Sequence, residues 1–436
     1  MSFKALLTNF TLLFILNACG GATNTTKDVN STLTNPLFKQ INIGFGASGA
    51  FPFMGNNGSA VWISSADLIL NKNIGNNNTY QTIKNFNVAQ FNILQTYLKN
   101  TKFVGYWFTK YWSTTWFNLS KIQKLMDNGY IPVFHYWYFG DTLQNHFPTG
   151  QEINDYHVNN AKLASFLAQL HGEFLIIMEP EFNKSVITNT ATNQHNFATI
   201  IANAIDIIKK GNTQALFSLC MTDTGRRDAS SIDPTCGYKN CALGDINAWD
   251  IPKIIYNDLS KKLDFVSFQE MVGQFHRNSL NPGSWNSPIP ISSTDIGTGI
   301  TFLPQRISNF SKYLSNKYNK PIFLPYVAIP TETWIDSNND NVIQKSELNP
   351  VGWETQASNA YQGLMQRKQE LLNNNLFGFS TISLFDDPQH DIGGYQYFIN
   401  NEYHMGIIKT TAKDKVDKYP FGDIVFKGSI INTLFF

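Results

Sequence analysis

The sequence has almost no net charge, because 33 lysine and arginine residues face 32 aspartate and glutamate residues and leave a formal charge of +1. A protein that neutralises nucleic-acid phosphates needs a basic excess. No such excess exists here, so the composition argues against a nucleic-acid partner. With 436 residues and 42% hydrophobic content, the chain can bury a large core, as one big domain or two ordinary ones.

Cysteine is also scarce, with four residues in the whole chain. Cys19 lies near the N-terminus, and the spacing of the other three matches no zinc site. In an oxidising compartment Cys236 and Cys241 are the favoured disulfide pair, since they lie five residues apart in a glycine-containing loop. That pairing leaves Cys220 as a free cysteine in a buried strand.

A dinucleotide-binding turn is missing as well. Residues 44–49 read Gly-Phe-Gly-Ala-Ser-Gly, which fits Gly-x-Gly-x-x-Gly after a strand. The motif must then open a helix. The segment that follows, Phe-Pro-Phe-Met-Gly-Asn-Asn-Gly, cannot form a regular helix, so a nucleotide cofactor is not expected.

The N-terminus predicts export. Residues 1–18 hold one basic residue, Lys4, and then an apolar run too short to span a bilayer. The run ends in Leu-Asn-Ala before Cys19, which resembles a bacterial lipoprotein signal with lipidation at Cys19. An ordinary signal, cleaved after Ala18, is the alternative. Residues 19–39 are predicted to be a flexible tether, which would hold the protein on the bacterial cell envelope by a membrane lipid anchor.

Apolar strand patterns alternate with amphipathic helical patterns from residue 40 onwards. Eight such units predict parallel strands with helical crossovers, and hence a closed (β/α)8 TIM barrel, an α/β fold, over residues 40–436. An open doubly wound sheet is the alternative. The expected strands are 40–45, 102–108, 130–138, the start of 173–183, 215–221, 264–271, 321–329 and 377–385. One expected helix ends near residue 100. The others span 119–127, 160–170, 197–210, 251–263, 303–318 and 353–373.

Residues 173–183 carry the main chemical signal, because an apolar strand ends in two acids, Glu179 and Glu181. Residues two apart on a strand point to the same side, so both carboxylates are expected on one face. In a barrel this is the catalytic end of the strands. The other strand ends are rich in acids and aromatic residues, and a mouth of this kind suits the cleavage of glycosidic bonds. The aromatic and acidic residues expected to bind sugar are Trp107, Trp112, Tyr136, Trp137, Trp334 and Asp386.

The eight-unit pattern and the segment Met-Glu-Pro-Glu-Phe-Asn at 178–183 resemble clan A glycoside hydrolases. Glu181-Phe182-Asn183 is similar to the His-Glu-Met-Asn of family 26, the mannanase-like group. The resemblance implies a two-carboxylate, retaining, endo-acting hydrolase of a polysaccharide such as β-mannan, with Glu181 as acid/base. Aligned differently, Glu179 takes that role.

This chain departs from the clan at the seventh strand. Pro325 and Tyr326 stand where the clan places its nucleophilic glutamate, which leaves Glu270 and Glu332 as candidates. Two further interpretations stay open. Glu179 and Glu181 could act as a pair, as in chitinase-like enzymes, or the barrel could be a non-catalytic carbohydrate-binding surface lipoprotein.

Residues 336–347 follow the calcium loop of EF-hand and dockerin type, with Glu347 able to bind bidentately at position 12. Position 6 is Asn341, which tolerates the left-handed conformation required there. A polar, asparagine-rich loop is the alternative. The loop predicts a structural calcium ion as cofactor. No organic cofactor is expected. Its expected ligands are Asp336, Asn338, Asp340, Val342 and Glu347.

Overall fold

The computed structural model describes residues 35–46, 49–222, 245–271, 295–329, 331–333, 351–352, 354–386, 404–409 and 419–435. Four sets of predicted features lie outside these residues: Cys19 with its signal segment, the Cys236–Cys241 pair, Trp334 and the calcium loop 336–347. They stay predictions. Of Glu332 the backbone is described and the side chain is not. Within the described residues, no helix is long and apolar enough to cross a membrane.

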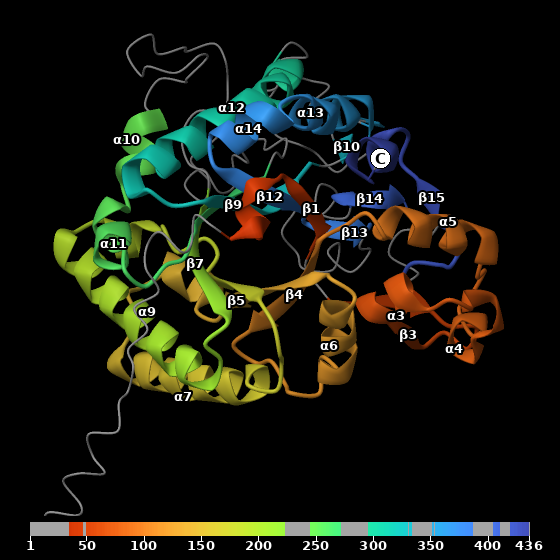
Figure 1. Cartoon of the computed structure of the whole chain (residues 1–436), viewed down its shortest axis with the longest axis horizontal. Coiled ribbons are helices and arrows are strands. Elements are labelled where there is room, and N and C mark those ends of the chain that lie inside the picture. Colours follow the sequence, from red (N-terminus) through yellow and green to blue (C-terminus); the bar gives the residue numbers. More distant parts are fainter. Residues whose placement is uncertain are drawn as a thin grey trace, which may run out of the picture. The chain divides into compact units, whose positions relative to one another are not determined.

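Eight strands form a closed barrel in the order β1-β12-β9-β8-β7-β6-β5-β4, and every neighbouring pair is parallel. The predicted (β/α)8 barrel is therefore confirmed, and Figure 1 shows its strands at the centre with the helices around them. The barrel strands are β1 (Asn42–Phe45), β4 (Phe103–Thr109), β5 (Ile131–Trp137), β6 (Phe174–Met178), β7 (Ala215–Thr222), β8 (Val266–Met271), β9 (Ile322–Ala328) and β12 (Leu376–Thr381).

Successive side chains on each strand point alternately into the barrel and outwards to the helices, and both surroundings are apolar. Alternate side chains fill the inside, where Phe323 stacks on Phe377 and the ring of Phe103 meets both of them edge to face. Leu37 belongs to the same buried cluster. Leu37 lies in the short helix η1 (Pro36–Lys39), so the barrel domain begins within the stretch predicted as tether.

The main helices cover the outside of the strands, and helix starts follow ordinary capping chemistry. Helix α6 (Leu119–Asp127) matches its prediction, whereas α7 (Gly150–Leu167) begins ten residues earlier than expected. The Thr149 side chain and Glu152 form a capping box there, a Thr-x-x-Glu signal visible in the sequence. The other large helices are α5 (Val88–Leu98), α9 (Ala191–Gly211), α11 (Lys253–Asp258), α12 (Asp295–Tyr318), α13 (Glu354–Gln366) and α14 (Lys368–Asn373).

Additions to the barrel follow three of its strands, β1, β9 and β12. Residues 50–64, which follow the glycine motif, form an antiparallel hairpin and not the helix that a dinucleotide-binding motif would open. The predicted eighth strand is broken in two, because its second half leaves the barrel and pairs with the C-terminal region. These additions are β2 (Ala50–Met54), β3 (Ala60–Ser64), α3 (Ser65–Leu70), β10 (Glu332–Thr333), β11 (Val351–Gly352), β13 (Ser383–Phe385), β14 (Gly406–Lys409), β15 (Val425–Phe426) and α16 (Ile430–Phe435).

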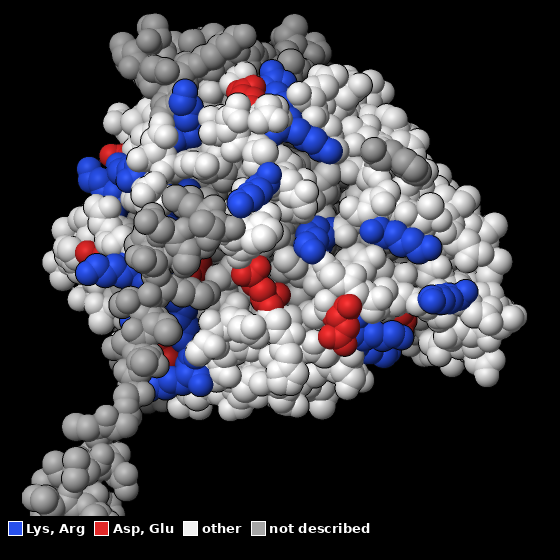
Figure 2. Space-filling model, viewed as in Figure 1, with Lys and Arg blue, Asp and Glu red and all other residues white. Residues whose placement is uncertain are grey.

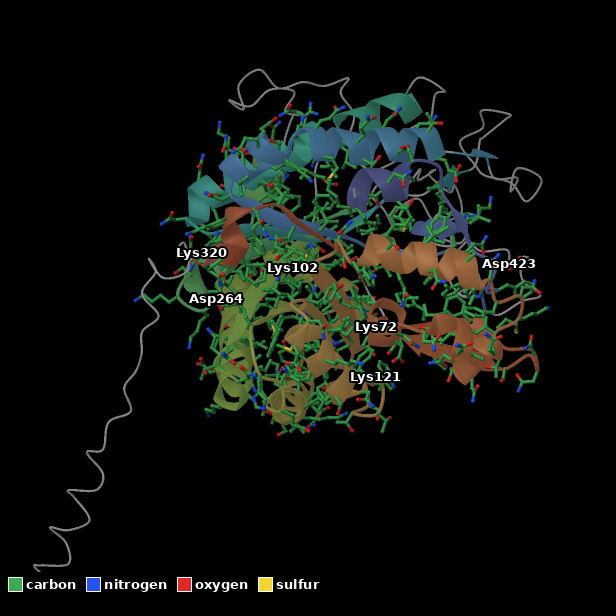
Figure 3. All side chains as sticks on the ribbon, turned by 45° about the vertical axis from the view of Figure 1, so that its right-hand side comes forward. Lys72, Lys102, Lys121, Asp264, Lys320 and Asp423 are labelled. Carbon is green, nitrogen blue, oxygen red and sulfur yellow. The ribbon has the colours of Figure 1, made fainter. Side chains whose placement is uncertain are left out.

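The two ends of the barrel are distinguished by the direction of its parallel strands. Lys102, Asp264 and Lys320, labelled in Figure 3, lie just before β4, β8 and β9 and mark the end where the strands begin. The opposite end, where the strands finish, is called the mouth below.

On the face shown in Figure 2, the described basic side chains are spread out and not gathered in one patch, as the near-zero net charge leads one to expect.

Candidate active site

The two glutamates of the opening motif separate in the fold. Strand β6 ends at Met178, and both Glu179 and Glu181 have positive φ angles, 38° and 69°. Positive φ is uncommon outside glycine, and it breaks the alternation that would put both side chains on one face. The carboxylates consequently have different partners, and the prediction that they share a face is wrong.

Glu181 lies in the mouth and is held by residues from three places in the chain. Its Oε1 accepts a hydrogen bond from Gln269 Nε2 at 2.8 Å, and its Oε2 forms an ion pair with Lys184 Nζ at 2.9 Å. The hydroxyl of Tyr326 donates to the same carboxylate; burial first, and then this negative charge, raise the pKa of Tyr326 well above its usual value. The Glu181 N–H donates to the Cys220 carbonyl at 3.0 Å, which fixes its backbone to β7.

Aromatic side chains on the inner faces of the strands line the mouth beside Glu181. Trp107 stacks on His135 with ring centroids 5.0 Å apart, and lies 5.8 Å from Tyr326 and 6.0 Å from Trp137. Trp107 and Trp137 are partly exposed, as sugar-stacking rings must be. The structure therefore places these two predicted residues where a ligand can reach them.

His135 was not among the predicted site residues. It is 1% exposed, and neither ring nitrogen has a hydrogen-bond partner among the described residues. Burial lowers its pKa to about 3, so the ring is neutral at physiological pH. Gln269 and Lys184 were missed as well. The alternation Phe265, Ser267, Gln269 is visible in the sequence and could have identified Gln269 as facing inward.

Glu270 faces the other way. Strand alternation puts Gln269 inside the barrel and Glu270 outside, where the Glu270 carboxylate is completely buried. Its Oε1 lies 3.5 Å from Nε of Arg306 on α12, and that arginine is also buried. The prediction of Glu270 as catalytic partner of Glu181 is therefore corrected: this acid belongs to an ion pair behind the barrel wall.

Tyr136 and Trp112 are also displaced from the predicted sugar platform. Both are buried in the layer between the strands and the helices. The Trp112 Nε1–H donates to Asn159 Oδ1 at 2.6 Å, and the Tyr136 hydroxyl lies 3.2 Å from the same oxygen. Asn159 belongs to α7, so these aromatic residues attach a helix to the barrel and do not reach the mouth.

Asp386 has a structural partner of its own. Its Oδ1 lies 2.5 Å from Lys427 Nζ, and both side chains are 1% exposed. Lys427 also donates to the carbonyls of His404 and Gly406. Asp386 thus connects the end of β13 to the C-terminal segment, and the prediction that it binds sugar is corrected. Of Glu332 the structure describes the backbone, which pairs with Gly352 between β10 and β11.

No family model matches this chain, and no curated protein matches it. Among solved structures, the family 1 β-glucosidase from Thermotoga maritima in complex with isofagomine lactam aligns with a TM-score of 0.50 and 12% sequence identity. That alignment covers 90% of this chain and 97% of the other. The β-glucosidase from the same organism in complex with glucoimidazole gives a TM-score of 0.49 at 12% identity, over 90% of this chain and 96% of the other. At such identity the likeness shows the fold alone, a single (β/α)8 barrel.

Proposed function

We propose that this protein is a glycoside hydrolase in which Glu181 is the acid/base. The observation that carries the proposal is the position of the Glu181 carboxylate in the mouth, next to Tyr326, whose ring lies 5.8 Å from the partly exposed indole of Trp107. The fold supports it through the resemblance to a β-glucosidase barrel, although the residue assignment depends on the site and not on that resemblance.

Each part of the site has a task in this chemistry. The ring of a sugar stacks on Trp107 and Trp137, which orients the glycosidic oxygen towards Glu181. Glu181 then transfers a proton to that oxygen as the bond breaks, and it activates water in the second step of a retaining reaction. Gln269 and Lys184 hold its two carboxylate oxygens, so the acid keeps one orientation. Glu332 is the candidate nucleophile that remains from the sequence, since Glu270 faces Arg306.

The finer parts of the proposal rest on the sequence. They are endo-acting cleavage of a β-mannan-like polysaccharide, kinship with family 26, export, lipidation at Cys19 and a calcium bound by residues 336–347.

The test compares Glu181→Gln with wild type on a panel of polysaccharides that includes β-mannan, with release of reducing ends as the readout. Removing a general acid/base is expected to lower the rate by roughly 10²- to 10⁴-fold. Glu354→Gln is the matched control, because Glu354 is an exposed glutamate in the first turn of α13 and lies outside the site. Unchanged turnover in Glu181→Gln would remove Glu181 from the chemistry.

One observation favours a second candidate, a non-catalytic carbohydrate-binding surface lipoprotein. Strand β9 carries Tyr326 where the clan has its nucleophile, and Tyr326 instead donates a hydrogen bond to Glu181. Titration calorimetry with the same polysaccharides separates the two candidates. Binding by wild type with no release of sugar selects the binding protein.

A further inference from the structure

Glu179 is a buried acid that the proposed chemistry does not use. Its side chain has no solvent exposure, and it lies beside Tyr136 of β5 and Tyr156 of α7 in the layer outside the barrel wall. Burying a carboxyl group costs free energy unless hydrogen bonds compensate for the lost water. Beside the Tyr156 hydroxyl of α7, the side chain of Glu179 has two backbone partners, and both lie at the end of strand β5.

Three hydrogen bonds connect Glu179 to that strand end. The Glu179 N–H donates to the Tyr136 carbonyl at 2.8 Å. Its Oε1 accepts from the Tyr138 N–H at 3.3 Å, and its Oε2 accepts from the Phe139 N–H at 3.1 Å. The register between β5 and β6 stops at Tyr136 and Met178. Beyond that point β6 offers no backbone carbonyl to β5. The side-chain oxygens of Glu179 therefore accept the hydrogen bonds of the Tyr138 and Phe139 N–H groups instead.

The residue between these bonded positions is Trp137, the last residue of β5. Its indole lies 6.0 Å from that of Trp107 in the mouth. Gly140 lies close to this indole: it has a φ of 52°, and a Cβ atom added there would come within 3.3 Å of the ring. The backbone after Trp137 thus forms a tight support for the ring, and Glu179 holds that backbone.

We propose that Glu179 is a positioning residue: by binding the N–H groups of Tyr138 and Phe139, it fixes the indole of Trp137 in the mouth. Its positive φ is part of the same arrangement, because it turns the chain so that Glu179 reaches β5 while Glu181, two residues later, reaches the mouth. This role in orienting Trp137 follows from the contacts of Glu179 and does not depend on the proposed function. Its consequence for sugar binding rests on the proposed function.

The first test needs no substrate. Two indoles as close as Trp107 and Trp137 give a circular-dichroism couplet in the far ultraviolet, and the Trp137→Phe variant defines its amplitude by difference. Glu179→Leu keeps the buried volume but leaves both N–H groups without their acceptor, so most of the couplet should be lost. Tyr361→Phe is the matched control, since Tyr361 is a buried tyrosine of α13 that is not a partner of Glu179, and it should keep the wild-type couplet.

Amide hydrogen exchange gives a second measurement, in Glu179→Gln, which retains the shape and one acceptor oxygen in case the leucine variant does not fold. Exchange in residues 137–140 should become roughly tenfold faster for each hydrogen bond lost, while exchange in β6 stays unchanged. A folded Glu179→Leu protein with the wild-type couplet, or unchanged exchange of residues 137–140 in Glu179→Gln, would overturn the proposal.

If wild type hydrolyses β-mannan, the kinetic consequence can be measured too. Loss of a fixed stacking ring should raise KM roughly tenfold in Glu179→Gln with kcat nearly unchanged. A loss of kcat with unchanged KM would mean that Glu179 acts on the chemical step and would refute a role through Trp137. Absence of any hydrolysis would count against the proposed function, and the two substrate-free measurements would still decide the role of Glu179.

Discussion

Glutamine at position 179 should make the stability of the protein less sensitive to pH, and the structure gives the sign of the effect. Burial raises the pKa of Glu179 from 4.5 to about 8, against the opposing effects of the Phe139 N–H, the Tyr156 hydroxyl and the Tyr138 N–H. In the unfolded chain the same group ionises near its ordinary pKa of 4.5. Between these two pH values the folded state binds the extra proton, so its stability falls as pH rises.

The size of the effect follows from the two pKa values. The step from 4.5 to about 8 corresponds to a loss of up to ~5 kcal/mol of unfolding free energy, at about 1.4 kcal/mol per pKa unit. The loss is complete above about pH 8, where the carboxyl group is ionised in both states. Glu179→Gln removes this titration and keeps an acceptor oxygen for the backbone.

Urea denaturation of wild type and Glu179→Gln across this pH range measures the difference directly. Other titrating groups contribute equally to both proteins, so the difference in unfolding free energy isolates residue 179. Glu179→Gln should gain stability relative to wild type as pH rises from about 4.5 to about 8. A difference that stays constant over this range would refute the reasoning, because it would mean that Glu179 ionises normally in the folded protein.

Two further predictions concern the Glu270 ion pair and the calcium loop that the sequence predicts. Glu270→Leu should destabilise the protein by roughly 3–5 kcal/mol, since it leaves the buried Arg306 without this carboxylate, and adding Arg306→Met should recover much of the loss in urea denaturation. Equal stability of the single and double variants would contradict the ion pair. Calcium chelation should lower the melting temperature of the wild type, and Glu347→Gln should abolish that shift; a chelator without effect would count against the loop at 336–347.

The sequence was sufficient for the barrel because the relevant patterns are local. Apolar runs such as that of β7 and amphipathic periods such as that of α6 lie within a few residues of their observed bounds. Glu181 was identified for the same reason, since it follows the fourth strand directly. The capping box at Thr149 was equally local and could have set the start of α7.

The partners of Glu181 depended on long-range geometry. Whether a side chain faces the mouth depends on strand parity, and the sequence placed Tyr136, Glu270 and Asp386 in the mouth without regard to it. Parity also changes where the backbone departs from extended geometry. The positive φ angles after β6 and the register shift between β8 and β9 are two such places. Both depend on pairing with strands that lie tens of residues away in the chain.

The amino-acid sequence by itself thus determined the strands, the helices and the order in which they alternate, because each depends on residues three or four positions apart. Tertiary structure alone decided which carboxylate enters the mouth and which is buried behind the wall. Glu179 and Glu181 differ in no local property that the sequence reveals. They separate because the end of β5 offers two backbone N–H groups to the first, while Gln269, Lys184 and Tyr326 hold the second.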